Sequence, residues 1–108
     1  MVRSNVVTIR VKPKVEKRGV RVTSVELSAE KYEIVVGEEV VFTLTVGLEA
    51  EAPAPLTWSG GVFVDGNRIM TVNVVFPRGS RVASTRFRIQ FTKPGEYNVY
   101  VEGGDYAK

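Results

Sequence analysis

Residues 40–48 carry the sequence VVFTLTVGL, and this stretch decides the fold class. Phe42, Leu44 and Val46 recur at every second position, with threonines between them. A period of two places successive side chains on opposite faces of a β-strand, whereas one face of a helix needs a period near 3.6. The stretch therefore predicts a strand with one buried face. Because it is the clearest alternation in the chain, we expect this strand to be central.

Similar alternation recurs on both sides of this stretch, with turn residues between the runs. Asp65-Gly66-Asn67 predicts a tight hairpin because these residues tolerate positive φ, and Pro77-Arg78-Gly79-Ser80 predicts a second turn. No segment keeps the apolar stripe of an amphipathic helix, so we expect an all-β chain. Loops are expected at residues 49–59 and 103–108. Further strands are expected at residues 6–11, 20–27, 32–36, 61–64, 68–76, 81–91 and 97–101.

The length and hydrophobic content predict one domain with one core. The chain has 108 residues, of which 44% are hydrophobic. We expect an N-terminal strand within residues 1–13, a charged linker at residues 14–19 and a β-sandwich at residues 20–108. No stretch approaches the roughly 18 consecutive apolar residues that a membrane helix needs, so we expect no membrane span.

The absence of two residue types removes whole classes of chemistry. The chain has no cysteine and no histidine. Disulfides, the usual zinc and copper sites, and Ser-His-Asp or Cys-His nucleophiles are therefore excluded. Asp65 and Asp105 are the only aspartates, and neither lies in a calcium-loop pattern. We expect a protein without catalytic activity, cofactor or metal.

The order of several short motifs points to a family. These motifs are Gly37-Glu38-Glu39-Val40, Val64-Asp65-Gly66, Pro77-Arg78-Gly79 and Pro94-Gly95-Glu96-Tyr97. Over about residues 20–102, the chain resembles the immunoglobulin-like modules of prokaryotic surface proteins, especially CARDB-type adhesion domains. The resemblance implies a Greek-key β-sandwich of about seven to nine antiparallel strands. It also implies an extracellular or cell-surface spacer, adhesion unit or filament subunit.

Two further features extend this resemblance. Tyr97 follows a Pro-Gly turn, as does the tyrosine of the tyrosine corner, whose hydroxyl bonds to the backbone upstream. The many valines and charged residues are similar to those of proteins from hot environments, archaea among them. Within residues 20–27, Val25 and Leu27 are the expected inward pair.

The segment before the sandwich resembles a strand that belongs at its end. In such modules a closing strand follows the Pro-Gly-x-Tyr strand, but here a suitable segment comes first and ends at Pro13, which lacks a ladder donor. Val7, Ile9 and Val11 share one face and are the candidate assembly strand. Without them, an unfilled edge flanked by Phe87, Ile89, Val99 and Val101 is expected.

Three arrangements of this first strand are consistent with the sequence. The chain is a segment excised from a tandem array, or a subunit that donates the strand to a neighbour, or a sandwich that takes up its own strand in cis. The expected partners are therefore copies of the same chain or neighbouring modules.

A binding function through charge is the alternative. The net charge is +3 and the pI is about 9.4, with the basic residues crowded near the N-terminus. They could bind an anionic polymer, or they could form a solvated linker. Aromatic residues are not interleaved with them, which disfavours nucleic acid as a partner. The candidate anion-binding residues are Arg10, Lys12, Lys14, Lys17 and Arg18.

Trp58 is the candidate for a carbohydrate site. It falls in the predicted loop at residues 49–59, where a flat aromatic ring could stack on a sugar. The other interpretation is that this tryptophan plugs the end of the core.

Overall fold

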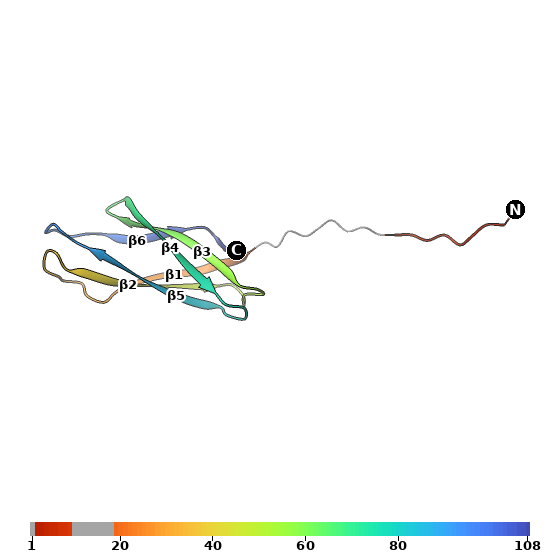
Figure 1. Cartoon of the computed structure of the whole chain (residues 1–108), viewed down its shortest axis with the longest axis horizontal. Coiled ribbons are helices and arrows are strands. Elements are labelled where there is room, and N and C mark those ends of the chain that lie inside the picture. The colour runs from red at the N-terminus through yellow and green to blue at the C-terminus, as the bar shows by residue number, and fades with distance from the viewer. Residues whose placement is uncertain (1, 10–18) are drawn as a thin grey trace.

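The computed structural model describes residues 2–9 and 19–108. Within these residues there is no helix, and seven strands form two antiparallel sheets, which confirms the all-β prediction (Figure 1). One sheet has the order β5-β2-β1-β7 and the other has the order β4-β3-β6. The strands are β1 (Val20–Ala29), β2 (Glu39–Leu48), β3 (Leu56–Val64), β4 (Asn67–Phe76), β5 (Val82–Gln90), β6 (Val99–Gly103) and β7 (Tyr106–Ala107).

Strand β2 is central in its sheet, as its alternation predicts. It pairs with β1 on one side and with β5 on the other. Its inward residues Phe42, Leu44 and Val46 are buried, while the threonines between them are half-buried on the other face. The second sheet supplies the opposite wall of the core through Trp58, Val62, Val74 and Phe76.

The hairpin between β3 and β4 follows from its turn residues. Asp65 and Gly66 have φ values of 49° and 83°. Positive φ at both central residues of a two-residue loop is the type I′ geometry, whose twist matches that of paired strands. From this turn, the β3–β4 ladder extends from the pair Val64↔Asn67 to the pair Leu56↔Phe76.

One corner of the two sheets is closed by the end of the chain. Strand β7, which follows β6, pairs with the start of β1, with Val20 opposite Ala107. Lys108 meanwhile exchanges two backbone hydrogen bonds with Thr57 of β3, at 2.8 and 3.0 Å. This region, which we name the closed corner, therefore ties both sheets together, and Figure 1 shows the C-terminus beside the start of β1.

Two predicted strands are wrong in the described residues. Residues 32–36 form a loop between β1 and β2 rather than a strand, and Tyr32 is 87% exposed. The described part of the first run, residues 6–9, is not a strand either. A strand needs a ladder partner, and alternation alone does not supply one.

Two predicted loops contain strands instead. Strand β3 begins at Leu56, inside the loop predicted for residues 49–59. Strand β7 lies inside the loop predicted for residues 103–108, and Ala107 is fully buried. Both segments gain their strand conformation from long-range backbone pairing.

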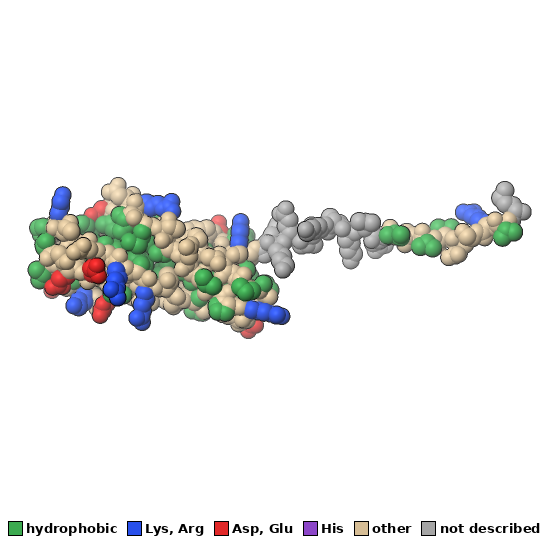
Figure 2. Space-filling model, viewed as in Figure 1, with side chains coloured by type: hydrophobic (Ala, Val, Ile, Leu, Met, Phe, Trp, Pro, Cys, Tyr) green, Lys and Arg blue, Asp and Glu red, His purple; other side chains and the backbone are tan. Residues whose placement is uncertain are grey.

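Charged side chains lie on the outer surfaces of the sheets, and apolar side chains gather between the sheets. In the space-filling view (Figure 2), Lys, Arg, Asp and Glu side chains stand on the outside of the sheets. Hydrophobic side chains are visible between the sheets at the end away from the C-terminus. Among residues 2–9 and 19–108, the structure contains no helix with the length and apolar character that crossing a membrane requires.

Candidate functional site

The edge of the sandwich between β1 and β6 is open. Within residues 2–9 and 19–108, strand β6 is the last strand of its sheet and pairs only with β3. Strand β7 covers the corresponding edge of β1 only near Val20 and Arg21, and the Val22 N–H donates to the Asp105 carbonyl. Beyond this point, no strand of the described part of the chain lies between β1 and β6. We name this opening, between residues 23–29 of β1 and Val99–Gly103 of β6, the seam.

The exposure of Val25 shows that the seam lacks a cover. In an antiparallel pair, opposite residues share one face of the sheet. Val25 is opposite Val46, which is fully buried, so both side chains point toward the core. Val25 is nevertheless 40% exposed. On β6, Val99 and Val101 also face the core and are only partly buried.

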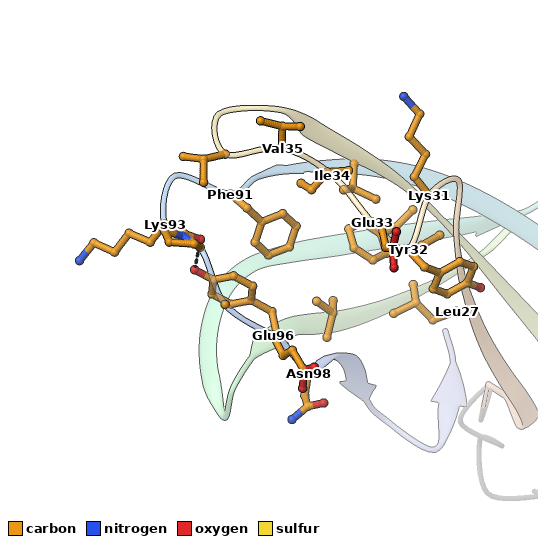
Figure 3. A pocket seen from close by; sticks show the side chains of 18 of the residues that line it. Leu27, Lys31, Tyr32, Glu33, Ile34, Val35, Phe91, Lys93, Glu96 and Asn98 are labelled. Carbon is orange, nitrogen blue, oxygen red and sulfur yellow. Dashed lines mark hydrogen bonds between the residues drawn. The ribbon is translucent and has the colours of Figure 1, made fainter.

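Two cavities lie along the seam. The larger, of about 860 Å³, lies at the end away from the closed corner, which we name the open end. Figure 3 shows Leu27, Ile34 and Phe91 directed into this space, while Lys31 and Lys93 point away from it. The smaller cavity, of about 190 Å³, lies next to the closed corner and is lined by residues that include Val25, Trp58 and Gly103. Apolar side chains, among them Val25, Leu27 and Phe91, form part of the lining of these two cavities.

Acidic side chains outnumber basic ones along the rim of the seam. Residues 23–36 and 93–105 contain six carboxylates and two lysines, all of them exposed. An excess of one charge favours a partner of the opposite charge. The carboxylates belong to Glu26, Glu30, Glu33, Glu96, Glu102 and Asp105, and the lysines are Lys31 and Lys93.

Tyr97 holds the turn at the rim of the larger cavity. Its hydroxyl donates a 2.7 Å hydrogen bond to the carbonyl of Lys93, four residues upstream. This is the backbone bond expected of a tyrosine corner. Its ring lies 4.8 Å from that of Phe91, centroid to centroid. The tyrosine therefore connects the turn to an apolar residue of the cavity lining.

Replacement of Tyr97 by phenylalanine should remove this bond and keep the ring contact. We expect the free energy of unfolding to fall by about 0.5–1.5 kcal/mol, the usual net value of one hydrogen bond. Urea denaturation followed by circular dichroism measures the change. A loss as large as that of a Tyr97→Ala variant would contradict this role for the hydroxyl.

The expectation of a sugar-stacking site at Trp58 is wrong. Its side chain is 1% exposed, so a pyranose ring has no face on which to stack. The indole N–H donates a 2.7 Å hydrogen bond to the Gly104 carbonyl. Gly60 and Gly103 are paired opposite each other, and a Cβ on either would collide with the indole. Trp58 is thus a core residue whose ring occupies the space left by two glycines.

The remaining predicted residues divide between described and undescribed parts of the chain. Val7 is 75% exposed and Ile9 is 81% exposed, without a ladder partner in the described structure. Val11 and the five candidate anion-binding residues, Arg10, Lys12, Lys14, Lys17 and Arg18, lie outside the described residues. Among the residues that are described, no group of three or more Asp or Glu side chains is placed to hold a metal ion.

The predicted unfilled edge is partly correct. Val99 and Val101 flank the seam, but Phe87 and Ile89 are buried on β5, on the far side of β2. Ile34 and Phe91 line the larger cavity but were not predicted as site residues. Ile34 is followed directly by Val35 and Val36, and Phe91 is the last residue of the expected strand at residues 81–91, so neither stands out in the sequence. Comparison of the chain with family models, with curated proteins and with solved structures found no match.

Proposed function

We propose that this chain is a non-catalytic interaction module that joins other modules by pairing of strand edges. Its fold would be an immunoglobulin-like Greek-key β-sandwich of the kind that the CARDB resemblance implies. The connections support this assignment, because β2 to β3, β4 to β5 and β5 to β6 each pass from one sheet to the other. In a surface or extracellular protein, such a module would serve as a spacer, an adhesion unit or a filament subunit.

The open seam is the observation that carries this proposal. An edge strand presents unpaired N–H and C=O groups, and natural proteins usually protect such edges. Here the edge of β6 adjoins inward-facing valines and a cavity of about 860 Å³ whose lining includes Leu27, Ile34 and Phe91. Strand addition would satisfy the backbone and cover these apolar side chains in one step. A module that joins others through its edge is therefore the function that this geometry favours.

The proposal is tested by measuring mass in solution. We expect the full chain to form dimers or longer assemblies whose proportion rises with concentration in size-exclusion chromatography with light scattering. A chain without residues 1–13 should remain monomeric, because it lacks the candidate assembly strand. Circular dichroism checks that this shorter chain keeps its β-sheet. A full chain that stays monomeric at every concentration, with the seam still accessible, would refute edge-mediated joining.

The alternative of an anion- or carbohydrate-binding accessory domain gains no support from the described residues. Trp58 is buried, and the basic residues proposed for anion binding are outside the described part. The experiment that addresses it is titration with an acidic polysaccharide at low and high salt. Salt-sensitive binding by the full chain, lost when the basic residues are neutralised, would favour the alternative.

A further inference from the structure

We infer that the seam accepts the N-terminal segment of a second copy of this chain, antiparallel to β6, with Val7 and Ile9 inserted between the sheets. This inference rests on the proposed function, because it names the partner and the edge through which modules join. The acceptor is built from described residues of β1 and β6, and the donor residues Val7 and Ile9 are described and exposed.

Of the two strand edges that border the seam, the edge of β6 is the more suitable for pairing with an added strand. On β1, part of the edge is already paired with β7 and with the Asp105 carbonyl. On β6, no strand among the described residues pairs with the edge away from β3 along any of its five residues. An added strand on β6 would also give the second sheet four strands, the same number as the first. Its inward side chains would then lie over Val25 and the cavity lining.

The register follows from the inward positions of β6. Opposite residues of an antiparallel pair share a face, so Ile9 opposite Val101 points into the sandwich. Val7 is then opposite Gly103, beside the smaller cavity that Gly103 and Trp58 help to line. Thr8 is placed on the outer surface opposite Glu102. The sequence continues the apolar pattern two residues later, opposite Val99.

The charges of donor and acceptor are complementary. Residues 1–18 contain six basic residues and one acidic residue, whereas the rim of the seam has six carboxylates and two lysines. Opposite charges on two surfaces speed their encounter and disfavour incorrect partners. The donor segment is followed in the sequence by Pro13, which cannot donate to a ladder. Both features favour this segment over an unrelated apolar strand.

The direction of the added strand favours a second copy over the same chain. Strands β6 and β7 both run antiparallel to β3, and β7 runs antiparallel to β1. A strand antiparallel to β6 would therefore begin near the closed corner and finish at the open end. In cis, the chain must then return to the closed corner to begin β1 at Val20.

The length of that return is close to the limit of the linker. From Val99 to Ala107 the path along β6 and β7 is about 26 Å at the usual strand rise. The nine Cα–Cα steps from residue 11 to Val20 reach at most about 32 Å when fully extended. Two reversals of chain direction would have to fit within this small excess. A donor from another copy has no such constraint, and repetition of this head-to-tail contact gives a ring or an open filament.

Disulfide trapping tests the edge, the register and the partner together. Because the chain has no cysteine, single variants give unambiguous cross-links. Thr8→Cys is mixed with Glu102→Cys under mild oxidation, and the product is identified by non-reducing electrophoresis and peptide mapping. Two matched controls replace Glu102→Cys with Val75→Cys on β4 or Arg86→Cys on β5, both exposed and on other edge strands. A Tyr100→Cys partner reports a register shifted by two residues.

We expect the Thr8–Glu102 cross-link to exceed each control by about tenfold, the difference that 1.4 kcal/mol of preference produces. Equal or greater cross-linking to β4 or β5 would overturn the inference and leave edge-mediated joining intact. Preferential cross-linking at Tyr100 would overturn the register. In a chain that carries both cysteines, a purely intramolecular disulfide would overturn the second-copy assignment. Absence of both cross-links and assemblies would refute the proposed function as well.

A second pair of variants tests whether the Val7 side chain inserts between the sheets or acts only as an exposed apolar residue. Val6 and Val7 are neighbours and are each 75% exposed, but they lie on opposite faces of an extended segment. Val7→Asp would place a charge between the sheets and should weaken assembly of the full chain at least about tenfold. Val6→Asp should leave assembly unchanged. Equal losses for the two variants would contradict insertion of the Val7 face.

Discussion

Replacement of Trp58 by alanine should lower the free energy of unfolding by about 3–5 kcal/mol, the cost of removing a fully buried large aromatic side chain. The indole is 1% exposed and occupies the space above the paired Gly60 and Gly103. Since glycines cannot refill that space, the cavity should collapse poorly. Urea denaturation followed by far-ultraviolet circular dichroism measures the change without relying on tryptophan fluorescence.

A phenylalanine at the same position provides the control. Trp58→Phe keeps much of the apolar volume but loses the hydrogen bond from the indole N–H to the Gly104 carbonyl. We expect a smaller loss than for alanine, made up of that bond and a small cavity. An alanine variant as stable as the native chain would show that Trp58 does not carry this part of the core.

Replacement of Leu44 by alanine should cost about 2–5 kcal/mol. Leu44 lies on the core side of β2 and is fully buried, with Leu27 and Thr85 opposite it on the two neighbouring strands. Its position in the middle of a central strand leaves few mobile groups that could close the resulting cavity. The same denaturation experiment gives the magnitude.

Thr43→Ala is the matched control for Leu44→Ala. Thr43 precedes Leu44 on β2, but its side chain lies on the opposite, half-buried face of the sheet. We expect its loss to change stability by less than about 1 kcal/mol, within the range of β-propensity effects. If the two variants were equally destabilised, the assignment of the faces of β2 would be wrong.

Alternation of apolar and polar residues predicts those strands that have one face against the core and one face toward solvent. Strand β2 begins one residue before the predicted range of 40–48, and β4 begins one residue before the predicted range of 68–76. In both strands, one face packs against the core and the other is more exposed. The Asp65-Gly66 turn was predictable for a different reason, because its chemistry is local.

Strands that depend on distant backbone partners were not predictable in this way. Residues 56–60 contain Trp58 among small and polar residues and follow two prolines, so local composition favours a loop. They form a strand because β4 pairs with them and because Trp58 enters the core. Residues 106–107 form a strand through pairing with β1, which leaves no periodic signal in so short a segment.

The sequence predicts that one edge of the sandwich is unfilled, but it does not predict where in the fold this edge lies. The sequence predicts an unfilled edge that Val99 and Val101 would border. It does not indicate that this edge lies against β1, where Val25 is left exposed. That arrangement depends on the crossing of β7 between the sheets, which a single-sequence pattern does not encode.

The closed corner sets how the sandwich would respond to tension. Gly19 and Lys108 lie close together there, beside the pairing of Val20 with Ala107. A force that pulls residues 19 and 108 apart would act on one end of the β1–β7 ladder. The few hydrogen bonds of β7 would therefore break one after another. The long ladders of β2 and β3 would bear little of that load. Under traction at these two points the corner would open before the core unfolds, so the module would lengthen in steps.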